Sequence, residues 1–240
     1  MRLGTAPLVV GNFPQFSGQH WTILGICLVG CVALGVLGNR LRGRPGEWLV
    51  RRILGTAVLC FGVPVQLWEM ISAGSRFYTS LPLQLCDLDW MVAAWALFTT
   101  GWRSRSVLYY WALTLTVQAI VTPSLGHLWP DPLFIGFWGV HVVTLWSAAY
   151  LCIGVGHGPD WRSYRWALLC TAVWAVLVMP FNAAVGTNYG FLNAKPPESS
   201  LLDLLGPWPV YVLEEAAVIV AGWALLTWPW VAARHSPRSS

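Results

Sequence analysis

Charged residues are scarce in this sequence, and their scarcity excludes most water-soluble folds. Only 10% of the 240 residues are Asp, Glu, Lys or Arg, whereas a soluble domain carries roughly 25%. Apolar residues make up 56% of the chain, and the mean hydropathy is +0.58. Because so few charges cannot cover a water-facing surface of this size, we expect most of the surface to contact lipid.

Lysine and paired-cysteine motifs are also lacking. The net charge of +4 comes from 13 Arg and one Lys scattered in ones and twos, which argues against a continuous basic face and therefore against a nucleic-acid partner. The six Cys lie in apolar runs without a C-x-x-C pair, so the sequence predicts neither a disulfide framework nor a zinc site. We expect no metal and no cofactor.

The sequence is instead rich in long apolar stretches. A helix needs about 20 mostly apolar residues to cross a hydrocarbon core roughly 30 Å thick, and Gly and Pro mark the gaps between such stretches here. We therefore expect an all-α protein, a seven-transmembrane-helix bundle that forms a single domain over residues 1–240. The predicted spans cover about 21–38, 50–71, 83–100, 106–121, 132–153, 164–184 and 208–230.

The distribution of basic residues predicts the orientation of this bundle, because basic loops are retained in the cytoplasm. Arg2, Arg76 and Lys195 fall on one side of the predicted spans. The opposite side holds Arg40, Arg42, Arg44, Arg51, Arg52, Arg103, Arg105, Arg162, Arg165, Arg234 and Arg238. With an odd number of spans, this pattern predicts a multi-pass plasma-membrane protein with its N-terminus outside and its C-terminus in the cytoplasm.

Polar residues inside the spans gather in the predicted outer half. An Asp at the centre of a membrane helix costs roughly 2.5–3.5 kcal/mol, so such residues are candidates for a functional site. The set comprises Gln66, Glu69, Gln84, Asp87, Asp89, Gln118, His141, Asn182, Glu214 and Glu215. We expect these side chains to converge on one hydrated cavity.

Cys86 differs from the other five Cys because it lies in this polar half, between Gln84 and two Asp. A thiol becomes a nucleophile when a nearby base takes its proton. His141 lies well inside the fifth span and is the first candidate for this base, and His20, just before the first span, is the second. We assign no role to the predicted loop residues His127, His157 and His235.

Several short motifs extend over nearly the whole chain. They are Phe16-Ser17-x-x-His20, Leu81-Pro82-Leu83-Gln84-Leu85-Cys86-Asp87, Thr187-Asn188-Tyr189-x-x-Leu192-x-x-Lys195-Pro196 and Leu205-Gly206-Pro207-Trp208-Pro209-x-Tyr211. Together with seven spans and a His in the fifth, they resemble the YwaF family of bacterial integral membrane proteins. That family is related to a eukaryotic transmembrane acyltransferase that remodels ether phospholipids.

The resemblance implies a Cys/His acyltransferase in which Cys86 and His141 move a fatty acyl chain between membrane phospholipids through a thioester. It also implies that the loop at Asn188-Tyr189 and the Gly206-Pro207-Trp208-Pro209 segment cap the cavity. The predicted substrate-binding residues are His20, Gln84, Asp87, Gln118, Asn182, Asn188, Tyr189, Lys195, Tyr211 and Glu214.

Two other functions fit the same sequence. The outer-half carboxylates Glu69, Asp87, Asp89, Glu214 and Glu215 could bind a cation or proton in a transporter. No matching polar set lines a cytoplasmic exit, however, and there is no inverted repeat. A non-enzymatic lipid-binding protein would instead hold a lipid in the cavity and leave Cys86 inert. The residues favour the enzyme.

Overall fold

The polypeptide folds into a bundle of helices. The computed structural model describes residues 13–196 and 200–235, and every regular element within these ranges is helical. Arg2 and Arg238, which contributed to the predicted orientation, lie outside them. The helices are α1 (Gly18–Leu41), α2 (Pro45–Ala73), η1 (Gly74–Thr79), α3 (Leu85–Thr99), α4 (Trp102–Trp111), η2 (Ala112–Thr116), α5 (Val117–Val121), α6 (Pro132–Ala148), η3 (Ala149–Gly154), α7 (Trp161–Val185), η4 (Tyr189–Phe191), η5 (Leu201–Leu204) and α8 (Val210–His235). The all-α prediction is confirmed.

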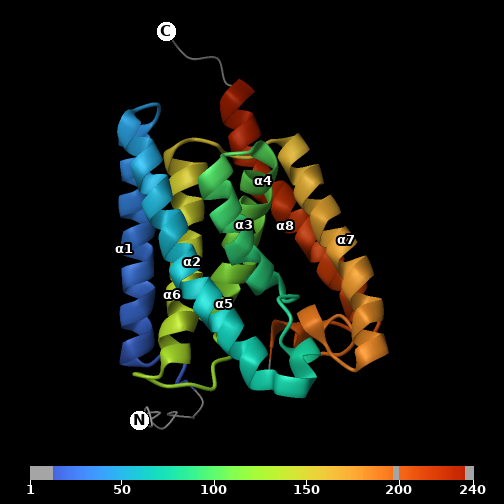
Figure 1. Cartoon of the computed structure of the whole chain (residues 1–240). Coiled ribbons are helices and arrows are strands. Elements are labelled where there is room, and N and C mark those ends of the chain that lie inside the picture. Colours follow the sequence, from blue (N-terminus) through green and yellow to red (C-terminus); the bar gives the residue numbers. More distant parts are fainter. Residues whose placement is uncertain (1–12, 197–199, 236–240) are drawn as a thin grey trace, which may run out of the picture.

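Several of these elements join into longer rods. The π-helical turn η2 connects α4 to α5 without a break, and the π-helical turn η3 continues α6. Within the described residues, seven rods therefore run alternately up and down the bundle, with α1 starting at the lower end and α8 ending at the upper end (Figure 1). The arginine-rich connections lie at the upper end, which we call the basic end.

Side-chain caps set several of the helix boundaries. The Ser17 hydroxyl accepts a hydrogen bond from His20 N at the start of α1. Asp131 and Asp160 cap α6 and α7 in the same way, and Pro132 occupies the first turn of α6, where its missing N–H is not needed. At its other end, α7 stops at Gly186, whose φ of 74° is a left-handed conformation that favours glycine.

Five rods are long and apolar enough to cross a membrane by themselves, rather than the seven predicted. They cover Gly18–Leu41, Pro45–Thr79, Pro132–Gly154, Trp161–Val185 and Val210–Arg234. The third predicted span is the 15-residue α3, which at 1.5 Å per residue extends only about 22 Å. The fourth, which contains α4, begins with Arg103 and Arg105. The chain is thus a multi-pass membrane protein.

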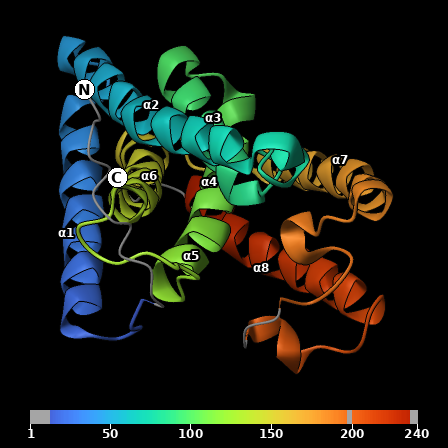
Figure 2. The same ribbon diagram turned by 60° about the horizontal axis from the view of Figure 1, so that its bottom comes forward.

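The two shorter rods lie inside the bundle. Leu97 of α3 and Tyr110 of α4 are completely buried, and α4 lies between α6 and α8 when the bundle is viewed from below (Figure 2). The outer helices expose large apolar side chains to the surroundings, including Leu28 of α1, Leu177 of α7 and Leu225 of α8. An apolar exterior of this extent is expected of a protein that is surrounded by lipid.

Glycine allows two close helix contacts. Gly38 of α1 packs against the backbone of Gly154 in η3, where any Cβ would clash. Gly62 of α2 packs in the same manner against the Trp90 ring of α3. Small residues commonly permit such close approach between membrane helices, and the second contact sets one wall of the site.

Candidate functional site

A cavity of about 980 Å³ lies in the part of the bundle away from the basic end. Its walls come from α2, α3, α4 with η2 and α5, α6 and α8, together with the loops after α5 and α7. Ligand pockets usually measure about 300–1,000 Å³, so this cavity has room for a large ligand. We refer to it as the large cavity.

The large cavity brings together five of the predicted site residues, from α3, α5 and α6. They are Gln84, Cys86, Asp87, Gln118 and His141. Gln66, Glu69 and Glu215, which belong to the predicted polar set, also line it. Other parts of its wall are apolar, including Val65, Leu115 and Ile219. The cavity therefore combines polar groups with an apolar surface that suits a hydrocarbon chain.

The start of α3 holds Cys86 beside two polar side chains. Gln84 precedes the helix, and its backbone N–H donates to Asp87 Oδ2 at 3.3 Å. The side-chain oxygen of Gln84 accepts a hydrogen bond from Gly190 N at 2.8 Å. Cys86 itself is half-buried and is a free thiol. The amide nitrogen of Gln84 is left with its two N–H donors.

The tautomer of His141 follows from its hydrogen bond. Nδ1 lies 2.7 Å from the carbonyl oxygen of Phe137, one turn earlier in α6. A carbonyl can only accept, so Nδ1 carries the proton, and in the neutral ring Nε2 is left as a proton acceptor. The Phe137 ring also packs on the imidazole, with the ring centroids 4.3 Å apart. His141 thus has the form that a general base needs.

His127 is a second histidine in the wall of the large cavity, and the sequence prediction of a loop residue without a role missed it. Its Nδ1 lies 3.2 Å from Oδ2 of Asp131. The other carboxylate oxygen of Asp131 accepts from Leu133 N at 2.8 Å and so caps α6. An aspartate that orients a histidine in this way also leaves Nε2 as the acceptor. The His-x-x-x-Asp spacing just before Pro132 was the available signal.

His20 lies outside the large cavity. It is completely buried, against the rings of Phe13 and Trp138. Both of its ring nitrogens are hydrogen bonded to backbone groups, those of Phe16 and Ile120. Neither nitrogen is available as a base.

Three predicted residues after α7 shape the loop instead of lining the cavity. The Asn182 amide nitrogen donates to Tyr189 O and to Asn193 Oδ1, and that of Asn188 donates to Ala194 O. The Tyr189 hydroxyl donates to Tyr78 O and accepts from the N–H of Leu81, both at 2.8 Å. Burial raises the pKa of Tyr189, so its hydroxyl stays protonated and remains a donor. These bonds present the neighbouring Gly190 and Phe191 to the cavity.

Lys195, Tyr211 and Glu214 likewise lie outside the cavity wall and tie down the start of α8. Lys195 Nζ donates to Leu205 O at 2.8 Å and lies 5.6 Å from the Tyr211 ring centroid. The Tyr211 hydroxyl donates to Phe191 O, and Glu214 accepts from Gly206 N at 2.6 Å. Among the paired acids at the start of α8, only Glu215 faces the cavity.

The five carboxylates of the transporter hypothesis are therefore divided. Glu69, Asp87 and Glu215 line the large cavity, whereas Glu214 holds a loop. Asp89 is completely buried and accepts a hydrogen bond from Thr116 Oγ1 at 2.7 Å. Among the described residues, no three His, Cys, Asp or Glu side chains come together as a metal site would require.

Comparison with known proteins gave one family match. Residues 15–227 match the TMEM164 family. A search of curated proteins and a search of solved structures found no significant match.

Proposed function

The chain belongs to the TMEM164 family, and on that premise we propose that it is an intramembrane acyltransferase, which moves fatty acyl chains between membrane phospholipids through a thioester at Cys86. One observation carries the proposal: Cys86 of α3 and His141 of α6 line a single large cavity. The resemblance to YwaF proteins and to an ether-phospholipid acyltransferase supports the same reaction.

In the first half-reaction, Cys86 Sγ attacks the ester carbonyl carbon of a donor phospholipid while His141 Nε2 takes the thiol proton. The bond between the carbonyl carbon and the glycerol oxygen then breaks. The proton passes from Nε2 to the departing oxygen, which leaves a lysophospholipid and an acyl thioester on Cys86.

In the second half-reaction, the hydroxyl of an acceptor lysophospholipid gives its proton to Nε2 and attacks the thioester carbonyl. The carbon–sulfur bond breaks, and the proton returns to Cys86 Sγ. The acceptor leaves with the acyl chain and the enzyme is restored, so no external oxidant or reductant is needed.

Each half-reaction develops negative charge on the carbonyl oxygen, which hydrogen-bond donors stabilise. Gln84 is the best-placed donor because its side-chain oxygen is held by Gly190 N, which leaves the amide nitrogen free to donate. Gln118 is a second amide in the cavity wall. The amide nitrogens of Asn182 and Asn188 are already bonded within their loop and do not serve this role.

The cavity walls suit a zwitterionic phospholipid. Val65, Leu115 and Ile219 provide apolar surface for an acyl chain. The carboxyl groups of Glu69, Asp87 and Glu215 attract the ammonium group of a head group such as choline or ethanolamine.

The reaction is tested with purified protein in proteoliposomes that contain phosphatidylcholine with a labelled acyl chain and an ether lysophospholipid as acceptor. We expect Cys86→Ala to abolish transfer and wild type to form a labelled adduct on Cys86 that hydroxylamine removes at neutral pH. Cys170→Ser, a half-buried cysteine outside the cavity, is the matched control. Unchanged transfer in Cys86→Ala would exclude the mechanism.

The same preparations discriminate the alternatives. A lipid that stays bound without transfer or adduct would indicate a lipid-binding protein. Ion or solute uptake that depends on Glu215 would indicate a transporter.

We further propose a plasma-membrane topology of seven crossings with the basic end in the cytoplasm, in which α3 and the α4–α5 rod cross inside the shield of the longer helices. Exposed Ser75, after α2, and exposed Arg44, before α2, lie at opposite ends of the bundle. In intact cells, a membrane-impermeant maleimide should label Ser75→Cys, and Arg44→Cys only after permeabilisation. The reverse pattern would invert the orientation.

A further inference from the structure

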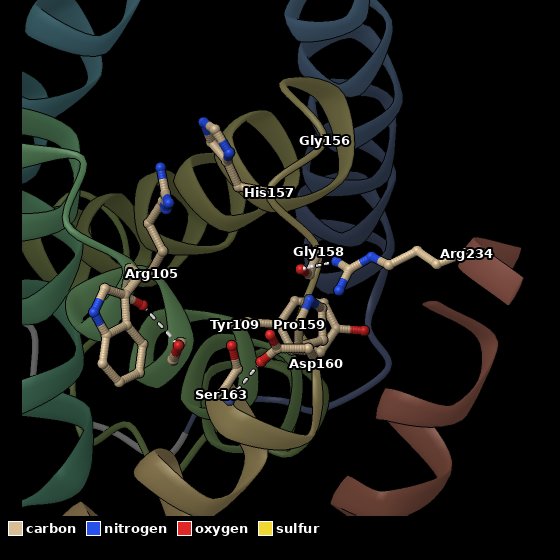
Figure 3. Close-up of a pocket in the computed structure, with 11 residues that line it drawn as sticks. Arg105, Tyr109, Gly156, His157, Gly158, Pro159, Asp160, Ser163 and Arg234 are labelled. Atoms are coloured by element: carbon tan, nitrogen blue, oxygen red, sulfur yellow. Dashed lines mark hydrogen bonds between the residues drawn. The ribbon is translucent and has the colours of Figure 1, made fainter. Parts of the chain in front are cut away.

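A second pocket, of about 220 Å³, lies at the basic end (Figure 3). It forms where the loop between η3 and α7 meets the start of α4 and the last turn of α8, and it shares no lining residue with the large cavity. Charged and polar side chains line much of it, among them Arg105, His157, Asp160 and Arg234. We call it the basic pocket.

Arg105 is the central feature of the basic pocket. Of the half-buried arginines among the described residues, Arg51 donates to Leu97 O and pairs with Glu47. The guanidinium of half-buried Arg105 makes no hydrogen bond or ion pair with any described residue. A guanidinium carries five N–H donors in a planar fork that fits phosphate oxygens. Arg105 thus presents an unused anion-binding group to the pocket.

Further positive groups face the same space. Arg234 donates one N–H to Gly158 O at 2.6 Å and keeps its other donors. The first turns of α4 and α7 also border the pocket, at Trp102 and Ser163. The N-terminus of a helix carries partial positive charge and favours anions.

The one acidic side chain in the pocket wall is already engaged. Asp160 Oδ1 accepts from Ser163 N at 2.7 Å and caps α7. Burial alone would raise the pKa of Asp160, but the hydrogen bonds from Ser163 and the charge of Arg234 outweigh it and hold the pKa below its ordinary value. Asp160 therefore stays ionised, and with Arg105 and Arg234 it leaves the pocket wall with a net positive charge.

Two glycines explain how the loop brings His157 to the pocket. Gly156 has a φ of 80°, and a Cβ there would clash with the Arg42 guanidinium. A Cβ at Gly158 would clash with the Trp230 ring. The loop therefore fits closely between α1 and α8, and His157 lies near Arg105 with Arg234 across the pocket (Figure 3).

We propose that the basic pocket binds a phosphate group, carried either by an anionic phospholipid or by a soluble phosphate compound. A volume of about 220 Å³ is below the usual range for drug-sized ligands and suits a single head group. Arg105 grips the phosphate oxygens, Arg234 closes the opposite side, and the helix N-termini add their dipoles.

The test uses the full chain in phosphatidylcholine nanodiscs, and it measures thermal unfolding and the mass of bound ligand. A ligand that binds the folded state raises the unfolding temperature. One arm adds inorganic phosphate at constant ionic strength. The other replaces a tenth of the phosphatidylcholine with phosphatidylglycerol. Stabilisation in the lipid arm alone identifies a lipid site, and stabilisation by inorganic phosphate identifies a site for soluble phosphate.

Arg105→Gln should weaken binding about tenfold or more, because it removes charge-assisted hydrogen bonds. Arg44→Gln is the matched control, since Arg44 is an exposed arginine at the same end that does not line the pocket. Should Arg105→Gln fail to fold, Arg234→Gln, at an exposed position, should weaken binding severalfold. No stabilisation of wild type in either arm, or equal binding by Arg105→Gln and Arg44→Gln, would overturn the proposal.

Discussion

His20 and Ile120 are joined by a hydrogen bond although they lie 100 positions apart in the sequence. His20 Nε2 donates to the Ile120 carbonyl oxygen at 2.8 Å, while Nδ1 accepts the N–H of Phe16, also at 2.8 Å. The neutral imidazole satisfies both backbone groups at once. It fastens the start of α1 to α5, close to where α5 ends.

Replacing this histidine should affect stability rather than chemistry. His20→Ala leaves the Phe16 N–H and the Ile120 carbonyl without their partner, and each unpaired buried group costs about 1–3 kcal/mol. We expect a lower unfolding temperature in nanodiscs, with acyl transfer per folded molecule close to wild type. Loss of transfer without loss of stability would instead show that His20 takes part in the reaction.

The two histidines of the large cavity can be ranked by their effect on rate. We expect His141→Ala to lower the transfer rate about 10²–10⁴-fold, the usual effect of removing a general base. His127→Ala should lower it less than tenfold. Single-turnover formation of acyl-Cys86 is the measurement, and the opposite ranking would assign the base to the His127–Asp131 pair.

Gln84 should contribute through its amide N–H groups. Gln84→Glu keeps an oxygen acceptor for Gly190 N but removes the donor, and losing one such donor typically lowers kcat about 10²–10³-fold. We expect kcat to fall with little change in KM or unfolding temperature. A large rise in KM at constant kcat would show that Gln84 binds lipid without stabilising the transition state.

Cavity volume can be reduced without disturbing packing. Gly222 of α8 lines the large cavity, and a Cβ there meets nothing within 4 Å. Gly222→Leu should therefore leave stability unchanged while it excludes long acyl chains, which is measured by competition between donors of different chain length. Gly25→Leu, in open space on α1 and outside the cavity, is the control. An unchanged chain-length preference would mean that the acyl chain lies elsewhere.

Stability should depend on pH through His157. Burial and, next, the charge of Arg105 lower the pKa of His157; Arg42 and Arg51 act in the same direction and Glu47 opposes them. Because the folded state binds the proton less readily than the unfolded state, whose histidine pKa is about 6.5, stability falls as the pH drops below about 6.5.

We therefore expect His157→Gln to reduce the loss of unfolding temperature between pH 7.5 and pH 5.5. The comparison is made in phosphate-free buffer, since a bound anion would favour the charged imidazole. An identical loss in wild type and variant would contradict the prediction.

Part of the candidate site followed from the sequence because the relevant residues are neighbours in one helix. Gln84, Cys86 and Asp87 lie within a single turn, so their shared environment is a local property. The polar side chain of His141 inside an apolar span indicated an inward position, and it does line the same cavity. The family resemblance supplied the expected chemistry, which the geometry alone does not name.

The remaining assignments depended on how each helix is rotated and how each loop is bonded. Glu214 and Glu215 are adjacent and chemically alike, yet one binds a loop N–H and the other faces the cavity. His127 reaches the cavity only because Asp131 caps α6 and holds its ring.

The sequence by itself determined that the chain is helical and crosses a membrane, because the length and hydrophobicity of a segment are sums over consecutive residues. Only the tertiary structure decided that α3 and α4 lie inside the bundle, that His20 is a backbone anchor and that Arg105 is left unpaired. Those outcomes depend on which groups from distant segments meet, and hydrogen bonds between distant segments leave no periodic pattern in the chain.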